Sequence, residues 1–254
     1  KLVLDNRVSS FFGDELIMGS YISRLFPLII GLYSFIFFKY ENHFVKSSIF
    51  FLFSFFSIYL VLLSGERTAF FLLIISLFLV IIFFNDFKKE KFFLFFSIII
   101  LSLILSLNTN LGSRIIKLTL LHSNLTTVLQ EDKKSNGKRP YIISKEYEKI
   151  FKTGIQIFVD NPYLGVGPKN FRVICGDKKY KNSKFTCSTH PHNTYIQLLS
   201  ETGIIGFLIV FSTMAYIFFL LIKNLYNKIR FKKIFLNNLQ ISILISLIIS
   251  LFPF

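Results

Sequence analysis

The sequence predicts an all-α polytopic membrane protein with about six transmembrane helices and one large, partly helical loop outside the cytoplasm. Two observations predict this fold class. The chain of 254 residues is 53% hydrophobic with a mean hydropathy of +0.59, and its apolar residues stand in long uninterrupted runs. Short loops rich in lysine and arginine separate several of these runs. This arrangement is typical of helices that have the lipid bilayer as their solvent.

Six apolar runs are candidate transmembrane helices. A helix needs about 20 residues to cross a hydrocarbon core of ~30 Å. The third and fourth runs are short for this purpose, so we expect them as a pair joined by a charged hairpin. The sixth run begins with Asn237, Asn238 and Gln240, which places the start of its apolar part near Leu239. The predicted spans are residues 21–38, 46–64, 68–84, 92–107, 203–222 and 234–254.

Lysine and arginine counts predict the orientation of these spans, because short cytoplasmic loops are enriched in both residues. Loops 39–46, 85–91 and 223–233 fall on one side of a six-span arrangement and together hold ten cations. The short loop Ser64–Arg67 on the other side holds one. We therefore expect the three basic loops in the cytoplasm.

The predicted organisation has three parts. Residues 1–107 form a membrane region with about four transmembrane helices, residues 108–194 form an extracytoplasmic loop, and residues 195–254 form a membrane region with two transmembrane helices, the last truncated. The chain starts at Lys1 without an initiator methionine and ends at Phe254 inside an apolar run. We therefore expect it to be part of a longer polytopic protein.

The net charge of +15 does not predict a nucleic-acid-binding protein, because of where the charges lie. Residues 108–194 hold fifteen Lys or Arg and six Asp or Glu, and much of the remaining positive charge lies in short loops between apolar runs. This distribution fits topology-setting loops and one basic segment outside the membrane. We expect membrane lipid around the spans and no nucleic-acid partner.

The long loop is expected to contain structure of its own. Apolar residues recur at helical spacing over residues 143–159, which predicts a helix on the membrane surface or over the spans. Asn161–Pro162 should end this helix. After a turn at Gly165–Gly167, Pro168 suits the first position of a short helix that carries Arg172.

Both cysteines of the chain, Cys175 and Cys187, also fall in this loop. A bridge between them would close a small ring and contribute about 3 kcal/mol in an oxidising compartment. The pair is therefore a disulfide candidate, with two free thiols as the alternative.

Two histidines stand where the loop meets the fifth span. The sequence His190-Pro-His192-Asn193 precedes a helix that should start at 193 or 194 and run through Glu201 into the span. His192 would then lie just before a helix N-terminus, where the dipole disfavours imidazolium and leaves a neutral imidazole able to accept a proton. The alternatives are a structural histidine pair and a zinc site. Zinc needs further ligands, and only His43 and His122 remain, so we expect no metal.

Three arginines are expected on the same outer surface as His192. Arg67 lies in the short hairpin between the second and third spans, Arg172 follows the glycine turn, and Arg7 precedes the first span. A guanidinium at the membrane surface can hold a pyrophosphate in a bidentate fork. The alternative for Arg67 is an interfacial anchor, or a pair with Glu66.

Several segments resemble the O-antigen ligase/polymerase superfamily. They are Asp160–Phe171 (DNPYLGVGPKNF), His190–Tyr195 (HPHNTY) and Glu201–Gly206 (ETGIIG). Ser64–Ala69 (SGERTA) is similar to a short arginine motif of that family, and Arg7–Gly13 (RVSSFFG) to a motif ahead of an earlier span. The order and spacing of these segments match the family across most of the chain.

The resemblance implies a metal-independent glycosyltransferase of the bacterial inner membrane that needs no cofactor, with residues 108–194 in the periplasm. Such enzymes move a glycan from undecaprenyl pyrophosphate to lipid A-core, as a ligase, or to a growing chain, as a polymerase. Carried onto this sequence, His192 would be the catalytic histidine, and Arg67 and Arg172 would contact the pyrophosphate. Accessory roles would fall to Arg7, His190, Asn193 and Glu201. Because Pro191 departs from the small polar residue common at that position, the role of His190 stays open.

Two other functions compete with glycan transfer. A transporter or channel would show ionisable residues in mid-span or paired broken helices, and the predicted spans contain almost none. A membrane-anchored assembly protein could use the basic loop to bind anionic envelope polymers. Its binding would fall with salt and would not need His192.

Overall fold

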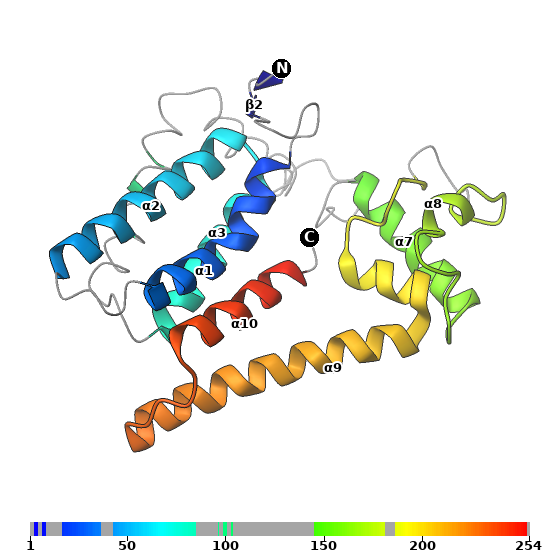
Figure 1. Cartoon of the computed structure of the whole chain (residues 1–254). Helices are drawn as coiled ribbons and strands as arrows, with labels where there is room; N and C mark the ends of the chain where they lie inside the picture. The colour runs from blue at the N-terminus through cyan, green and yellow to red at the C-terminus, as the bar shows by residue number, and fades with distance from the viewer. Residues whose placement is uncertain are drawn as a thin grey trace, which may run out of the picture. The chain divides into compact units, whose positions relative to one another are not determined.

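Figure 1 shows the computed structural model, which describes residues 3–4, 7–8, 17–36, 43–84, 145–180 and 186–252, with a few positions between 96 and 103. In this part of the chain the structure is helical apart from one pair of two-residue strands, β1 (Val3–Leu4) and β2 (Arg7–Val8), which is antiparallel. The described helices are α1 (Met18–Ile36), α2 (His43–Ser64), α3 (Arg67–Phe83), α7 (Lys145–Asp160), α8 (Phe171–Ile174), α9 (Thr194–Phe231) and α10 (Asn238–Ser250). The predicted all-helical architecture is confirmed to this extent.

The chain forms two compact units. The first comprises Lys1–Thr119 and Ile217–Ser250, and therefore holds α1, α2, α3, α10 and the end of α9. The second comprises Leu120–Tyr216 and Leu251–Phe254, and holds α7, α8 and the beginning of α9.

In the first unit, α1 packs against α10, α3 and α2. The helix backbones approach closely where a glycine faces a small side chain: Gly31 lies against Ser242 of α10. Ser246 of α10 donates a hydrogen bond to the carbonyl oxygen of Arg24 at 2.7 Å, so the two helices are also joined by a polar contact. Small residues and interhelical hydrogen bonds are the usual means of helix association where lipid removes the hydrophobic drive.

Three of the described helices are long and apolar enough to cross a membrane. They are Met18–Ile36, Ser47–Ser64 and Thr194–Phe231, and the apolar helices α3 and α10 are shorter. The described parts of the predicted runs 21–38, 46–64 and 203–222 thus lie in helices, and the run 68–84 is helical as far as Phe83. The run 92–107 lies almost entirely outside the described residues, and the run 234–254 is helical only over Asn238–Ser250.

Two predicted boundaries are wrong. The basic segment 223–233 is not mainly a loop, because α9 continues to Phe231. Neither glycine nor proline interrupts that stretch, and Lys228 and Arg230 in the last turn complement the negative end of the helix dipole. The second error is the short helix expected from Pro168. Since Lys169 adopts φ 62°, outside helical geometry, α8 starts only at Phe171.

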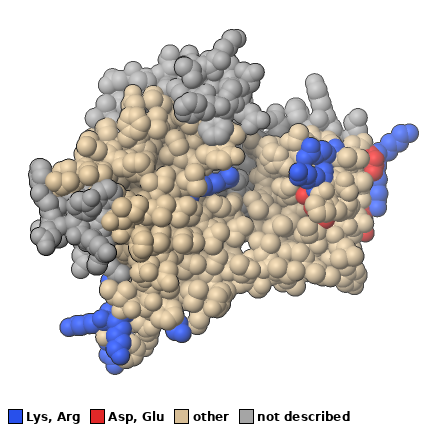
Figure 2. Space-filling model, in the orientation of Figure 1, with Lys and Arg blue, Asp and Glu red and all other residues tan. Residues whose placement is uncertain are grey.

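Helix α9 carries its charged residues toward its two ends. No Asp, Glu, Lys or Arg occurs between Glu201 and Lys223, and most side chains of that stretch are exposed or half-buried. Figure 2 shows basic side chains gathered at the C-terminal end of α9 and an uncharged surface along its length. A helix that is apolar on all sides and left uncovered by protein fits a lipid environment.

Candidate functional site

The start of α9 positions His192. The side-chain oxygen Oδ1 of Asn193 accepts hydrogen bonds from the backbone N–H groups of Tyr195 and Ile196, both at 3.1 Å. This N-cap contributes about 1 kcal/mol and confirms the helix start predicted at 193 or 194. His192, one residue earlier, has φ 55°, a left-handed conformation that is uncommon for a residue with a side chain. Local backbone strain of this kind is often found at functional sites.

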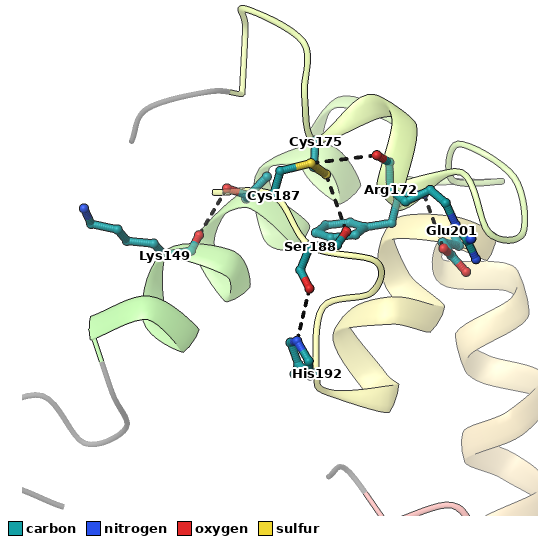
Figure 3. Close-up of a disulfide and its surroundings, with 9 residues drawn as sticks. Lys149, Arg172, Cys175, Cys187, Ser188, His192 and Glu201 are labelled. Atoms are coloured by element: carbon teal, nitrogen blue, oxygen red, sulfur yellow. Dashed lines mark hydrogen bonds between the residues drawn. A yellow bond between two sulfur atoms is a disulfide. The ribbon is translucent and has the colours of Figure 1, made fainter. Parts of the chain in front are cut away.

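The imidazole of His192 is half-buried among three side chains of the second unit. Its Nε2 lies 3.1 Å from the hydroxyl oxygen of Ser188, within hydrogen-bond distance (Figure 3). The ring of Tyr147 from α7 meets it edge-on, with centroids 5.2 Å apart, and the ring of His190 lies 4.2 Å away. His190 itself is exposed, and its Nδ1 lies 3.0 Å from the hydroxyl of Thr189.

This environment favours the neutral imidazole. Burial lowers the pKa of His192 below its ordinary value of 6.5, and the nearby charge of His190 lowers it further. The direction is the one expected from the sequence, but the main cause is desolvation rather than the helix N-terminus. A neutral imidazole at neutral pH can accept a proton.

A disulfide fixes the segment that leads to His192. Cys175 and Cys187 are bonded, with their Cα atoms 5.1 Å apart, and Ser188 follows directly (Figure 3). Cys175 is fully buried in a cluster with Ile150 and Ile157 of α7 and with Phe171 and Tyr180. The bridge therefore ties the Ser188 side of the histidine site to the core of the second unit.

The loop after α7 is locked to α9 by backbone hydrogen bonds. The N–H groups of Val166 and Gly167 donate to the carbonyl oxygens of Ser200 and Glu201 at 3.0 and 2.9 Å. In the opposite direction, the N–H of Ile204 donates to the carbonyl oxygen of Pro162 at 2.8 Å, and that of Ile205 to Tyr163 at 3.4 Å. Loop and helix start thus hold each other on both sides of a kink in α9.

Two glycines make this close approach possible. Gly203 forms the kink, with φ 65° and ψ −167°, and its Cα lies directly against the peptide between Tyr163 and Leu164. Gly165, with φ 63°, lies in the same way against the peptide after Glu201. A Cβ at either position would collide with backbone atoms of the other segment. The sequence predicted a turn at Gly165 and an uninterrupted helix through Gly203, and the second expectation is wrong.

Glu201 supports the start of α8. Its carboxylate is buried, with 6% of the residue exposed, and accepts hydrogen bonds from the N–H of Phe171 at 3.3 Å and from the side-chain amide of Gln197 at 3.1 Å. Arg172 is the next residue of α8 and is exposed. In the view of Figure 3, its side chain extends away from His192.

Arg67 lies in the first unit as the first residue of α3, where it is half-buried. The preceding Glu66 is 7% exposed, and the ion pairs found among the described residues do not include one between Glu66 and Arg67. Its carboxylate accepts hydrogen bonds from the backbone N–H groups of Gly19 and Ser20 at 2.6 and 3.1 Å, and from the hydroxyl of Ser20 at 2.6 Å. Glu66 therefore caps the N-terminus of α1.

This role of Glu66 was not predicted from the sequence. The available signal was Gly19-Ser20 at the start of an apolar helix, because helix N-termini leave amides that need an acceptor.

Arg7 lies in β2, and its side chain is outside the described residues, as is all of His122. Among the described residues, no three His, Cys, Asp or Glu side chains come together as metal ligands.

The second unit also has a pocket of about 420 Å³ that His192 does not line. Its polar lining includes Lys149, Lys152 and Gln156 from α7 and Tyr180 from the turn after α8. Beyond the lining, Lys179 forms an ion pair with Asp160 at 2.8 Å, and hydrogen bonds from Lys179 and Tyr180 lower the pKa of Asp160. The pocket is a basic, hydrogen-bonding surface.

Comparison with known proteins assigns the family. A family model described as O-antigen ligase matches residues 52–211, which is more than half of the chain. No curated protein matches the chain. The match includes both Arg67 and the histidine segment. The chain therefore belongs to the O-antigen ligase family, and it is a membrane protein.

Proposed function

We propose that this protein transfers a glycan from undecaprenyl pyrophosphate to an acceptor at the periplasmic face of a bacterial inner membrane. The acceptor is lipid A-core if the protein is a ligase, and a growing glycan chain if it is a polymerase. The observation that carries the proposal is the half-buried, neutral imidazole of His192 at the entrance of an apolar helix, in a chain of the O-antigen ligase family.

In the proposed reaction, His192 accepts the proton of the acceptor hydroxyl. The acceptor oxygen then forms a bond to the anomeric carbon of the glycan, and the bond to the pyrophosphate breaks, so that undecaprenyl pyrophosphate leaves. The hydroxyl of Ser188 already lies 3.1 Å from Nε2 of His192. Proton transfer to a general base requires a hydroxyl at about this distance. The Ser188 hydroxyl thus occupies a position that an acceptor hydroxyl could take.

The proposed role of Arg67 and Arg172 is to bind the pyrophosphate and to stabilise its charge as it departs. Both are accessible, Arg172 more than Arg67. The hydrogen-bond partners of the adjacent Glu66 carboxylate are at the N-terminus of α1. Arg7 and His190 are proposed as accessory groups. The proposed accessory role of Asn193 and Glu201 is structural, because their hydrogen bonds stabilise the starts of α9 and α8.

The proposed topology keeps six transmembrane helices, in membrane regions 1–107 and 195–254, and a periplasmic loop over residues 108–194. The disulfide between Cys175 and Cys187 supports an oxidising location for this loop. The charge-free stretch of α9, bordered by basic residues from Lys223 onward, supports a cytoplasmic C-terminal end for that helix.

Complementation tests the proposal. The complete gene is expressed in one strain that lacks its ligase and in another that lacks its polymerase, and the surface polymer is displayed on a gel. His192→Ala should nearly abolish polymer at unchanged protein level, because a general base supplies about 10²–10⁴-fold. His43→Ala is the matched histidine control and should retain activity. Wild-type polymer from His192→Ala in the rescued strain would rule out the mechanism.

An assembly protein that binds anionic envelope polymers is the second candidate function, and the basic pocket at Lys149 and Lys152 favours it. Such binding needs positive charge but no proton acceptor. If Lys149→Ala with Lys152→Ala abolishes salt-sensitive polymer binding while His192→Ala changes neither binding nor surface polymer, this function replaces glycan transfer.

A further inference from the structure

The loop between α7 and α8 presents two apolar side chains with no protein cover. Tyr163 and Leu164 are each 72% exposed, the highest values among the large apolar residues of the second unit that the structure describes. The backbone that carries them is held by four hydrogen bonds to α9 and packs against Gly203. Their exposure therefore belongs to a fixed loop rather than to a free chain end.

The same contacts place this loop at the beginning of an apolar helix. The N–H groups of Ile204 and Ile205 donate to the carbonyl oxygens of Pro162 and Tyr163. These amides are the first after the kink, and a helix start in lipid needs acceptors for them because no water is present. The loop supplies the acceptors, so it lies at the level where the apolar part of α9 begins.

The uncovered surface continues from the loop onto the helix. Ile205, Leu208 and Ile209 are 49%, 53% and 63% exposed. Ile205 adjoins the loop, because its N–H donates to the carbonyl oxygen of Tyr163, and Leu208 and Ile209 follow on the same face of the helix at i+3 and i+4. We call these three residues, with Tyr163 and Leu164, the loop–helix surface. The helical part of it belongs to a candidate membrane span, whose natural cover is lipid.

We propose that Tyr163 and Leu164 insert into the interfacial layer of the bilayer and anchor the loop that follows α7 at the membrane surface. Tyrosine is enriched at this level because its ring is apolar and its hydroxyl is polar. The anchor joins the membrane to the kink of α9, and Glu201 beside that kink holds α8. The anchored loop is thereby connected through α9 to α8 in the unit that contains His192.

Single-tryptophan fluorescence tests this assignment, because the chain contains no tryptophan. Tyr163→Trp and Leu164→Trp are made separately in the full-length protein, in which any tryptophan outside these 254 residues is replaced by phenylalanine, and are reconstituted in nanodiscs. The discs contain phosphatidylcholine that is unbrominated, brominated near the headgroup, or brominated near the chain end. Two controls share the protein background: Lys178→Trp in a charged, exposed turn, and Ile209→Trp in α9.

Tyr163→Trp and Leu164→Trp should lose emission in discs brominated near the headgroup and much less in discs brominated near the chain end. Ile209 lies five residues beyond Ile204, or ~7 Å further along the helix, so its tryptophan should respond more to the deeper bromines. Lys178→Trp should keep its emission in both. The proposal is overturned if Ile209→Trp is quenched while both loop variants keep their emission as Lys178→Trp does. That result would mean that water or another protein, and not lipid, covers the loop.

Discussion

Replacing Gly203 by alanine should destabilise the second unit, and the structure sets the magnitude. The backbone at φ 65° and ψ −167° lies in a region that only glycine occupies readily, which costs another residue about 1–3 kcal/mol. The new Cβ would also lie 2.6 Å from the backbone nitrogen of Leu164 and closer still to the carbonyl of Tyr163. Overpacking of this kind costs a further 1–3 kcal/mol, so we expect a loss of about 3 kcal/mol.

The assay is thermal unfolding in detergent at one scan rate. A loss of 3 kcal/mol corresponds to a fall of roughly 6 °C or more in the apparent Tm for a chain of this size. The matched control is Gly176→Ala, because the nearest atom to a Cβ there is the carbonyl oxygen of Val173 at 3.4 Å, an ordinary contact. This control should change the apparent Tm by less than about 1 °C.

A double-mutant cycle tests whether Gly165 and Gly203 contribute to the same packing contact between the loop and α9. Gly165→Ala should destabilise by a similar amount, because its Cβ would lie 2.6 Å from the Glu201 carbonyl oxygen. Once either alanine has separated the loop from α9, the second should cost much less, so the effects should be clearly less than additive. Additive losses, or an apparent Tm of Gly203→Ala equal to that of Gly176→Ala, would refute the packing argument.

Three further predictions concern pH, a helix cap and the disulfide. If His192 is the general base, transfer activity falls as pH drops through its lowered pKa, so the acidic limb of the pH–rate profile lies below pH 6.5. His190→Asn removes a neighbouring charge and should move this limb to higher pH. A limb that does not move contradicts this assignment. Glu66→Ala should lower the free energy of unfolding by about 2 kcal/mol, and Glu66→Gln should lower it by less because an amide oxygen still accepts hydrogen bonds. An equal loss in both variants on thermal unfolding would show that hydrogen bonding is not the cause. Replacing Cys175 and Cys187 together by alanine should cost about 3 kcal/mol, and reductant should then leave the apparent Tm of the variant unchanged while lowering that of the native protein.

Local patterns predicted the helices well. Uninterrupted apolar runs identified α1, α2 and α3 to within a few residues, because composition alone decides which segments are helical in lipid. Asn193 predicted the start of α9 because an N-cap acts within three residues of itself. The end of α9 was misplaced, because charge marks the limit of the apolar core and not the limit of the helix.

Long-range contacts were beyond the reach of such patterns. Glu66 caps a helix through Gly19, which lies 47 residues earlier, and no spacing rule connects the two. Gly203 follows a good helix start, so its sequence context favours continuation, and only the peptide of Tyr163 on its surface shows why the helix breaks. The sequence predicted a neutral His192 from the nearby helix dipole, which is a local feature. In the structure the largest cause of its lowered pKa is burial, which depends on long-range packing.

The kink explains how a polar site can stand at the entrance of an apolar helix. An unbroken helix from Thr194 would have carried its cap and His192 in line with the apolar run, and every amide of the apolar part would have been satisfied within the helix. Breaking the helix at Gly203 leaves the amides of Ile204 and Ile205 to be satisfied from outside. The loop at Pro162 and Tyr163 meets that need, and through Gly165 it also packs against the peptide between Glu201 and Thr202. The requirement to satisfy backbone amides in lipid thus explains why this loop is held against α9 at the kink, close to the helix start that follows His192.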